Sequence, residues 1–136
     1  MKVYVDTNVV VSAVATRGVC ADLLHVILAE HELVLGETVL TELRRVLGSK
    51  IGLSKETIGE LETFLRRQAT VVTARAAVPS TTLDAADAAV LAEAGTAAVD
   101  VLVTGDRDLL EVADPPVTIV SPRGLWERLR GLHKPR

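Results

Sequence analysis

The sequence predicts an α/β fold, a single three-layer α/β/α domain with a central parallel sheet of four or five strands. Short β-rich runs alternate with stretches of helical hydrophobic spacing, and the helical stretches have the length of crossover connections, roughly 10–15 residues. The 136 residues suffice for one core, and no repeat, low-complexity tract or linker divides them. We therefore expect one domain over residues 1–136.

Five short apolar runs, rich in β-branched residues, are the predicted strands. In chain order they are Lys2–Asp6, Leu33–Leu35, Ala69–Thr73, Asp100–Thr104 and Val117–Val120. Turn-forming residues follow several of them, such as Thr7 and Asn8 after the first run and Gly36 after the second. The apolar run Val9–Val14 fits either a helix or a strand.

Apolar residues at helical spacing predict helices between these strands. The predicted helices are Cys20–Glu30, Thr38–Leu47, Ser54–Arg67, Asp84–Ala98, Arg107–Val112 and a terminal helix that begins at Pro122. Ser54 fits an N-cap, Gly48 fits a C-cap, and Pro122 fits the first turn of its helix. Residues 74–83 form a connection.

Composition excludes several classes of protein. Hydrophobic residues make up 49% of the chain and charged residues 24%, as in ordinary globular domains. The lone Cys20 permits neither an internal disulfide nor a thiolate zinc site, and a reducing, cytoplasmic location fits. The N-terminus lacks the layout of a secretory signal, and no run of about 18 apolar residues predicts a membrane span.

Charge is distributed unevenly along the chain, whose formal net charge is −3. Residues 122–136 carry five Lys or Arg and one acid, whereas the rest carries ten bases and seventeen acids. Basic segments around an acidic body can bind a polyanion, although a basic C-terminal helix can equally serve solubility.

Two acids follow the ends of predicted strands. Asp6 closes the first strand, and Asp106 comes three residues after the buried run Val101–Val103. Because ligands bind outside the carboxyl ends of parallel strands, both carboxylates are candidates for a site at that edge of the sheet.

Two further acids lie on predicted helices. Glu42 is three residues after Val39 and four before Val46, so a charge there faces an apolar stripe and needs a cation or hydrogen bonds. Alternatively, Glu42 flanks that stripe at an exposed helix N-terminus. Asp87 shares a face with Val90, but it can also be a capping-box partner of Asp84.

Convergence of these four carboxylates would create a site for a hard divalent cation. Clustered acids repel one another unless a cation neutralises them, and oxygen-only ligands select Mg²⁺ or Mn²⁺ over zinc. Such an ion activates water and neutralises phosphate oxygens, as phosphodiester hydrolysis requires. No G-x-S-x-G elbow or Walker loop offers a competing chemistry.

Four segments together resemble the PIN-domain family of metal-dependent nucleases, from residue 3 to about residue 121. They begin at Val3, Val39, Asp87 and Val101, and read VYVDTN, VLTEL, DAAVLAEA and VLVTGDRDLL. The TGDxDLL segment, whose Asp106 lies 19 residues after Asp87, is the most specific.

The resemblance implies roles for individual residues. Its metal-binding and catalytic acids would be Asp6, Glu42, Asp87 and Asp106. Asp108 would be a supporting fifth metal-site acid, while Asn8 and Thr104 would orient a carboxylate or water by hydrogen bonds. Asp84 is better explained as a helix cap, although many relatives carry adjacent acids there.

Small PIN proteins of this length are typically ribonucleases, so the resemblance implies an RNA substrate. Many are toxins of toxin–antitoxin pairs, which implies an antitoxin partner and a homodimer. With three aromatic residues, the chain offers no base-stacking platform, and substrate would be held by Arg and Lys. The candidates are Arg17, Arg44, Arg45, Lys50, Arg66, Arg67 and Arg107.

Three other functions remain as alternatives. The same site could act on DNA, or the chain could be a binding or regulatory domain without catalysis. A signalling receiver domain is also a small α/β protein with strand-end acids, but it needs a mid-chain phospho-acceptor and a late lysine. Here no mid-chain strand ends in Asp, and after Lys55 the only lysine is Lys134.

Overall fold

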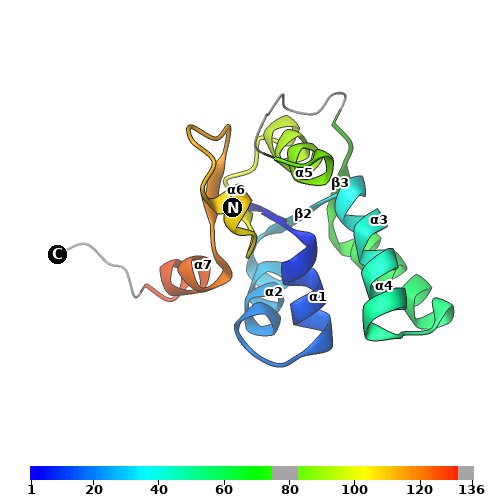
Figure 1. Ribbon diagram of the computed structural model, residues 1–136. Helices are drawn as coiled ribbons and strands as arrows, with labels where there is room; N and C mark the ends of the chain where they lie inside the picture. The colour runs from blue at the N-terminus through cyan, green and yellow to red at the C-terminus, as the bar shows by residue number, and fades with distance from the viewer. Residues whose placement is uncertain (75–82, 132–136) are drawn as a thin grey trace.

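A parallel sheet forms the centre of the computed structural model, which describes residues 1–74 and 83–131 (Figure 1). Its strands are β1 (Lys2–Val5), β2 (Glu32–Gly36), β3 (Thr70–Val72), β4 (Val101–Val103) and β5 (Thr118–Val120). They lie in the order β3-β2-β1-β4-β5, and every neighbouring pair is parallel. In this register Tyr4 of β1 lies opposite Val34 and Leu102. The predicted α/β fold with a parallel sheet is confirmed.

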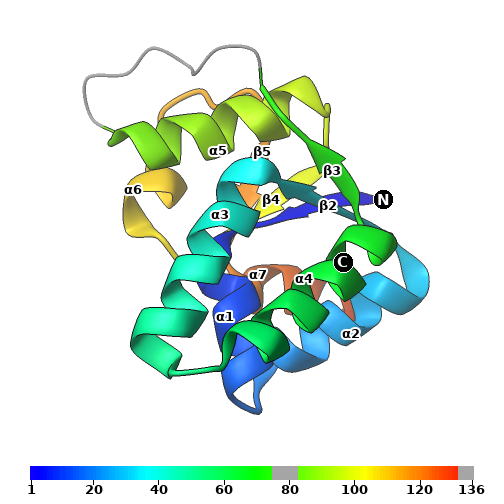
Figure 2. The ribbon, with the colours of Figure 1, turned by 90° about the vertical axis from the view of Figure 1, so that its right-hand side faces the viewer.

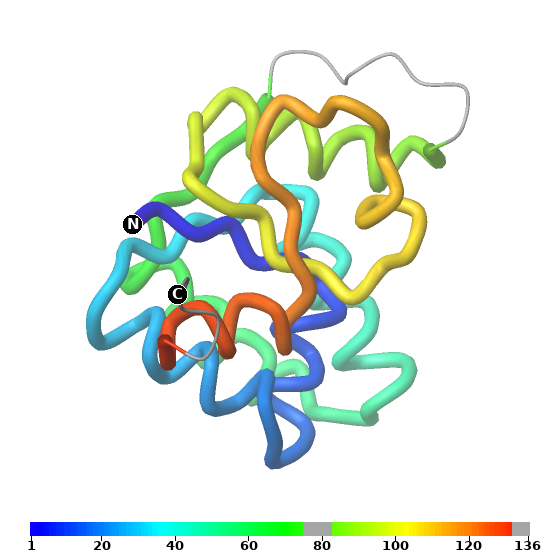
Figure 3. The backbone as a smooth tube through the Cα atoms, turned by 90° about the vertical axis from the view of Figure 1, so that its left-hand side faces the viewer, coloured from blue at the N-terminus to red at the C-terminus, as the bar shows by residue number. Residues whose placement is uncertain are grey.

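Helices cover both faces of this sheet. Within the described residues they are α1 (Thr7–Ala15), α2 (Val19–Glu30), α3 (Glu37–Val46), α4 (Lys55–Gln68), α5 (Ala85–Thr96), α6 (Arg107–Leu110) and α7 (Pro122–Leu129). Figure 2 shows α5 along one side of the sheet and α1, α2, α4 and α7 on the other. The chain's last helix, α7, returns to pack against α2 (Figure 3). Helix α3 contacts β2, α1 and α5, so it links the two sides near the carboxyl ends of the strands.

Most element boundaries follow the local signals in the sequence. Ser54 caps α4 by accepting from the N–H of Thr57 at 3.1 Å, and Pro122 stands in the first turn of α7. The ambiguous run Val9–Val14 is helical, since it lies within α1, whose N-cap is Asp6. Part of the predicted connection over residues 74–83 lies outside the described residues.

Gly48 is not the C-cap of the third helix, so that prediction was wrong. Helix α3 continues into a π-helical turn, η1 (Leu47–Ile51), and the N–H of Leu53 donates to the carbonyl of Leu47 at 2.9 Å. Gly52 then ends the turn with a φ of 80°, a left-handed conformation that suits glycine. The C-cap is therefore Gly52, four residues beyond Gly48.

The topology places a crevice between β1 and β4. The chain leaves β1 toward β2 and leaves β4 toward β5, so the two connections run in opposite directions across the sheet. Right-handed connections that diverge in this way pass over opposite faces. Ligands in open α/β sheets bind at such a point, outside the carboxyl ends of the strands.

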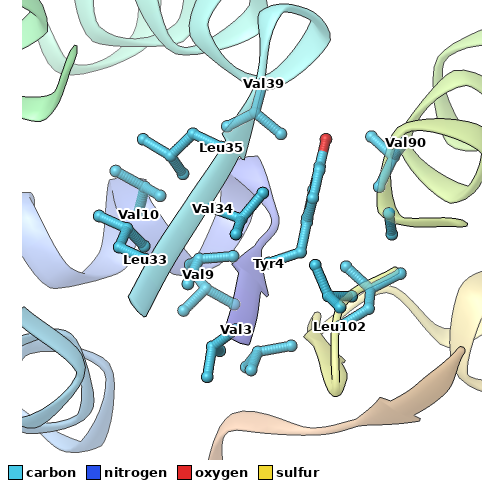
Figure 4. Packing of buried hydrophobic residues seen from close by; sticks show 14 of the residues in the cluster. Val3, Tyr4, Val9, Val10, Leu33, Val34, Leu35, Val39, Val90 and Leu102 are labelled. Atoms are coloured by element: carbon cyan, nitrogen blue, oxygen red, sulfur yellow. The ribbon is translucent and has the colours of Figure 1, made fainter. Parts of the chain in front are cut away.

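The core is almost entirely aliphatic. Its buried members come mainly from the strands and from the inward faces of α1, α2, α3 and α5 (Figure 4). Tyr4 is the exception, an aromatic residue that is fully buried and whose polar hydroxyl must therefore find a partner. No single helix among the described residues has the length and apolar composition to cross a membrane. Helices α1 and α2 have that length and composition only when taken together, and they are bent by 104° at their junction.

Candidate metal centre

A cavity of about 450 Å³ lies at the carboxyl ends of β1 and β4, between α1, α3 and α5. Its walls contain four carboxylates, which come from four different places in the fold. They are Asp6 after β1, Glu42 on α3, Asp87 in the first turn of α5, and Asp106 after β4. The fold thus gathers at one cavity four acids that span 100 residues of sequence.

Asp6 is the most deeply buried of the four, with 6% of its surface exposed. One carboxylate oxygen accepts from the N–H of Thr7 at 2.8 Å, and the other accepts from the hydroxyl of Thr104 at 2.6 Å. Burial raises the pKa of Asp6, the hydrogen bond from Thr104 opposes that shift, and the charges of Asp106 and Glu42 raise the pKa further. Asp6 is therefore held firmly in position but is poorly compensated for its charge.

The turn after β4 fixes Asp106 relative to Asp6. The hydroxyl of Thr104 donates to Asp6 and also accepts from the N–H of Asp106 at 3.0 Å, so one side chain links the two acids. The side-chain oxygen of Asn8 accepts from the N–H of Gly105 at 3.1 Å. Thr104 orients a carboxylate directly, whereas Asn8 contacts the backbone of the turn that carries Asp106.

Among the described residues, Asp87, Asp106 and Asp108 form a close group of carboxylates. One oxygen from each lies within 4.8 Å of the others, close enough to share a cation. Asp106 also caps α6, because its Oδ1 accepts from the N–H of Asp108 at 2.8 Å. Asp6 and Glu42 line the same cavity but are not members of this group.

Asp87 shows the electrostatic strain of this arrangement. Burial raises its pKa to about 7, helped by the neighbouring charges of Asp106, Asp84 and Asp6. Asp84 caps α5 by accepting from the N–H of Asp87 at 2.8 Å, as the capping interpretation predicted, and does not line the cavity.

Glu42 lines the cavity for a different reason from the one its sequence position indicated. Its side chain is 40% exposed, although Val39 on the same helix is fully buried. Its Oε1 pairs with the guanidinium of Arg45 at 2.9 Å. Glu42 is therefore not forced against the core, and its partial exposure is closer to the alternative in which it flanks the apolar stripe.

Glu93 is a buried acid to which sequence analysis gave no role. Only 3% of its surface is exposed, and its carboxylate accepts from the hydroxyl of Tyr4 at 2.6 Å and from the hydroxyl of Thr38 at 2.7 Å. Burial, followed by the bond to Glu93, raises the pKa of Tyr4 above its usual range. Helical spacing could have found Glu93, since it lies three residues after the buried Val90.

Three of the seven proposed substrate-binding cations form ion pairs within the protein, namely Arg44, Arg45 and Arg66. Arg44 pairs with Glu62 at 2.7 Å, and Arg66 pairs with both Glu37 and Glu62. Lys50 is the only cation among the described residues that line the cavity. It stands near the apolar wall formed by Val46 and Ile51.

The donor chemistry of the cavity fits a hard divalent cation. Its ionisable ligands are carboxylates alone, the type that binds Mg²⁺ or Mn²⁺ rather than zinc. The pKa values of Asp6 and Asp87 are raised first by burial and then by the charges of neighbouring acids, and a bound cation would oppose both effects. Asp87, Asp106 and Asp108 are the residues closest to one another for that purpose.

Comparison with known proteins agrees with the fold. Residues 2–108 match the model of the PIN domain. The fold is similar to that of VapBC2 from Rickettsia felis, solved bound to a DNA fragment from their promoter, with a TM-score of 0.62 at 17% identity over 89% of this chain and 98% of that chain. It is also similar to PAE2754 from Pyrobaculum aerophilum, with a TM-score of 0.61 at 19% identity over 96% of both chains. No curated protein matches the sequence.

Proposed function

Because this chain belongs to the PIN-domain family, we propose that it is a divalent-metal-dependent ribonuclease. Membership of the family implies nuclease activity in general. The observation that carries the finer proposal is the group of three carboxylates within 4.8 Å at the crevice between β1 and β4. Asp6 and Glu42 complete the proposed catalytic site from the adjoining walls of the cavity.

The protein's own residues would hold the ion and keep its ligands in place. Asp87, Asp106 and Asp108 would bind Mg²⁺ or Mn²⁺, and Asp6 would add a carboxylate whose direction Thr104 fixes. When bound, the ion supplies an activated water and neutralises charge on the phosphate. Asp87 would give up its proton as the cation binds, because burial and the neighbouring acids raise its pKa to about 7.

Substrate would meet a cavity that combines acids with one cation and an apolar wall. Lys50 is placed to contact a backbone phosphate, and the wall of Val46 and Ile51 can contact sugar or base. RNA is the substrate we propose, as the resemblance of the sequence to small PIN proteins implies. DNA is the main alternative, because nothing in these contacts distinguishes a 2′-hydroxyl.

Cleavage of matched RNA and DNA strands by the purified protein tests this proposal. We expect RNA to be cleaved in Mg²⁺ or Mn²⁺, EDTA to stop the reaction, and the DNA strand to remain intact. Asp106→Asn should be inactive while Asp22→Asn, a matched change on α2 outside the cavity, should keep full activity. Cleavage that persists in EDTA would refute the metal dependence, and preferential cleavage of DNA would refute the substrate.

We further propose that the protein is the toxin of a toxin–antitoxin pair and acts as a homodimer in the cytoplasm. The similarity of the fold to VapBC2, solved with promoter DNA, supports the pairing, whereas the homodimer and the location rest on the resemblance of the sequence to small PIN proteins. A short adjacent reading frame that encodes a DNA-binding protein is the expected genomic context. Co-expression should yield a stable complex without ribonuclease activity, and a protein that is fully active in the presence of that neighbour would contradict the pairing.

A further inference from the structure

One buried carboxylate joins the three elements that carry Asp6, Glu42 and Asp87. Glu93 belongs to α5, its Oε1 accepts from the hydroxyl of Tyr4 in β1, and its Oε2 accepts from Thr38 in α3. Figure 4 shows the hydroxyl of Tyr4 pointing between Val39 of α3 and Val90 of α5. The carboxylate therefore lies where strand and helices meet, and Glu93 is not among the residues that line the cavity.

Glu93 also caps a helix that has no cap of its own. The N-cap position of α3 is Gly36, which has no side chain, and the Oε2 of Glu93 accepts from the N–H of Thr38 in the first turn at 3.2 Å. A negative charge is favourable at a helix N-terminus. A Cβ on Gly36 would overlap the carboxylate of Glu93 and the hydroxyl of Tyr4, so the glycine leaves the space that this network fills.

Each partner of Glu93 is close in the chain to a proposed metal ligand. Tyr4 of β1 precedes Asp6 by two residues, and Thr38 precedes Glu42 by one helical turn on α3. Glu93 itself lies six residues after Asp87 on α5. A displacement of any of these elements would change the separation of the carboxylates at the cavity.

The presence of an acid at this buried place is informative. Burying a carboxylate is unfavourable, and a well-packed apolar side chain often stabilises a core as much. The charge of Glu93 is compensated by three donors from two other elements, so its geometry is highly specified. Such a network sets the relative position of the elements more strictly than aliphatic packing does.

We propose that Glu93 is a positioning residue that fixes β1, α3 and α5 relative to one another and thereby sets the divalent-metal affinity of the cavity. The proposal rests on the proposed function, because it takes the cavity acids as metal ligands. Loss of outer partners that orient metal ligands typically reduces metal affinity by about 10- to 100-fold. Glu93 would act less directly than such a partner, through the relative positions of β1, α3 and α5.

Isothermal titration of the full chain with Mn²⁺ tests the proposal. Glu93→Gln should weaken Mn²⁺ binding by about 10-fold or more, and Thr38→Val, which removes one donor, should weaken it less. Thr38→Ser keeps the hydroxyl and should restore wild-type affinity. Thr70→Val is the matched control, since it removes a hydroxyl bond to Glu32 of 3.0 Å at the opposite edge of the sheet, and its affinity should be unchanged.

Two further measurements separate positioning from general stability. Saturating Mn²⁺ should restore most of the cleavage rate of Glu93→Gln but not that of Asp106→Asn. Wild-type affinity in a folded Glu93→Gln protein would overturn the proposal; if that variant does not fold, wild-type affinity in both Thr38→Val and Tyr4→Phe would overturn it. Asp106→Asn distinguishes the two proposals, because unchanged Mn²⁺ binding in that variant would refute the proposed metal site itself.

Discussion

Two acids on helix α5 have opposite surroundings. Asp87, in the first turn, faces the carboxylates of Asp106 and Asp108, and its pKa is raised to about 7 by burial and by the neighbouring acids. Glu93, six residues later, is more deeply buried but accepts hydrogen bonds from Tyr4 and Thr38. The surrounding partners, rather than the degree of burial, distinguish the two.

The different partners distinguish a carboxylate whose charge is compensated within the protein from one whose charge is not. A buried carboxylate with donors on both oxygens is satisfied by the protein alone. A carboxylate whose neighbours are other carboxylates is satisfied only by a proton or a cation. Substitution should therefore destabilise the protein at Glu93, whereas at Asp87 it should stabilise the metal-free protein.

Loss of Asp106 should have the largest effect, on cleavage and on metal binding rather than on the fold. Asp106→Asn removes a charge from the three-acid group, so we expect cleavage to fall by more than about 100-fold, beyond the loss typical of an outer partner of a metal ligand. Circular dichroism should show an unchanged fold. Cleavage at the wild-type rate at equal Mg²⁺ concentration would show that the carboxylate group is not the reaction centre.

Removing Glu93 should reduce stability. Glu93→Ala leaves the hydroxyl of Tyr4 and the first-turn donors of Thr38 without their partner, at about 1–3 kcal/mol for each buried group. Relief of the buried charge offsets part of this, so we expect a net loss of about 2–4 kcal/mol in urea unfolding. A Glu93→Ala protein as stable as the wild type would show that the hydrogen bonds of Glu93 do not stabilise the fold.

Gly36→Ala probes the same network from its other side. The added methyl group would overlap the carboxylate of Glu93 and the hydroxyl of Tyr4, and overpacking of this kind costs about 1–3 kcal/mol. Gly59→Ala, on α4 with open space at that position, is the matched control and should not lower the free energy of unfolding. Equal stability of both variants would mean that the space around Glu93 is less constrained than the structure indicates.

Asp87 should make the metal-free protein less stable as the pH rises. Its folded pKa of about 7 exceeds the ordinary aspartate pKa of 3.8, so the folded state holds a proton that the unfolded state releases. This contribution is fully present below about pH 4 and is lost as the pH rises through 7. Asp87→Asn should therefore melt about 3 °C above the wild type at pH 7.5 in EDTA, after allowance for solvent screening, and at nearly the same temperature at pH 4.

The reverse order of melting temperatures at pH 7.5 would count against repulsion within the acidic group. Added Mg²⁺ provides the complementary measurement, because a ligand that binds only the folded state raises its stability. The wild type should gain more from Mg²⁺ than Asp87→Asn does. An equal gain in both proteins would indicate that the ion binds elsewhere.

The smallest effect is expected at a third kind of carboxylate, one paired with arginine at the surface. Arg66 contacts Glu37 at 2.8 Å and lowers its pKa, but both side chains are more than one-third exposed. Arg66→Ala should lower the free energy of unfolding by less than about 1 kcal/mol, and less still in high salt. A larger loss would show that this exposed pair contributes to stability in the way expected of the buried network of Glu93.

Local signals in the sequence located much of the fold and of the cavity. Asp6 and Asp106 follow strand ends, and the parallel order of the strands brings those ends to one edge. Ser54 and Asp84 could be recognised as N-caps because a cap bonds to a backbone N–H only three residues away. Such interactions lie within the range of a sequence pattern.

Only the tertiary structure decided which acids accept hydrogen bonds from buried donors and which face other acids. Glu93 and Tyr4 are 89 residues apart, and the exposure of Glu42 depends on a cavity whose walls come from several elements. Gly48 failed as a cap because the chain widened into a π-helical turn that ends at Gly52. By itself the sequence determined which residues carry charge and which strand ends they follow; packing between distant segments decided which charges meet donors and which meet one another.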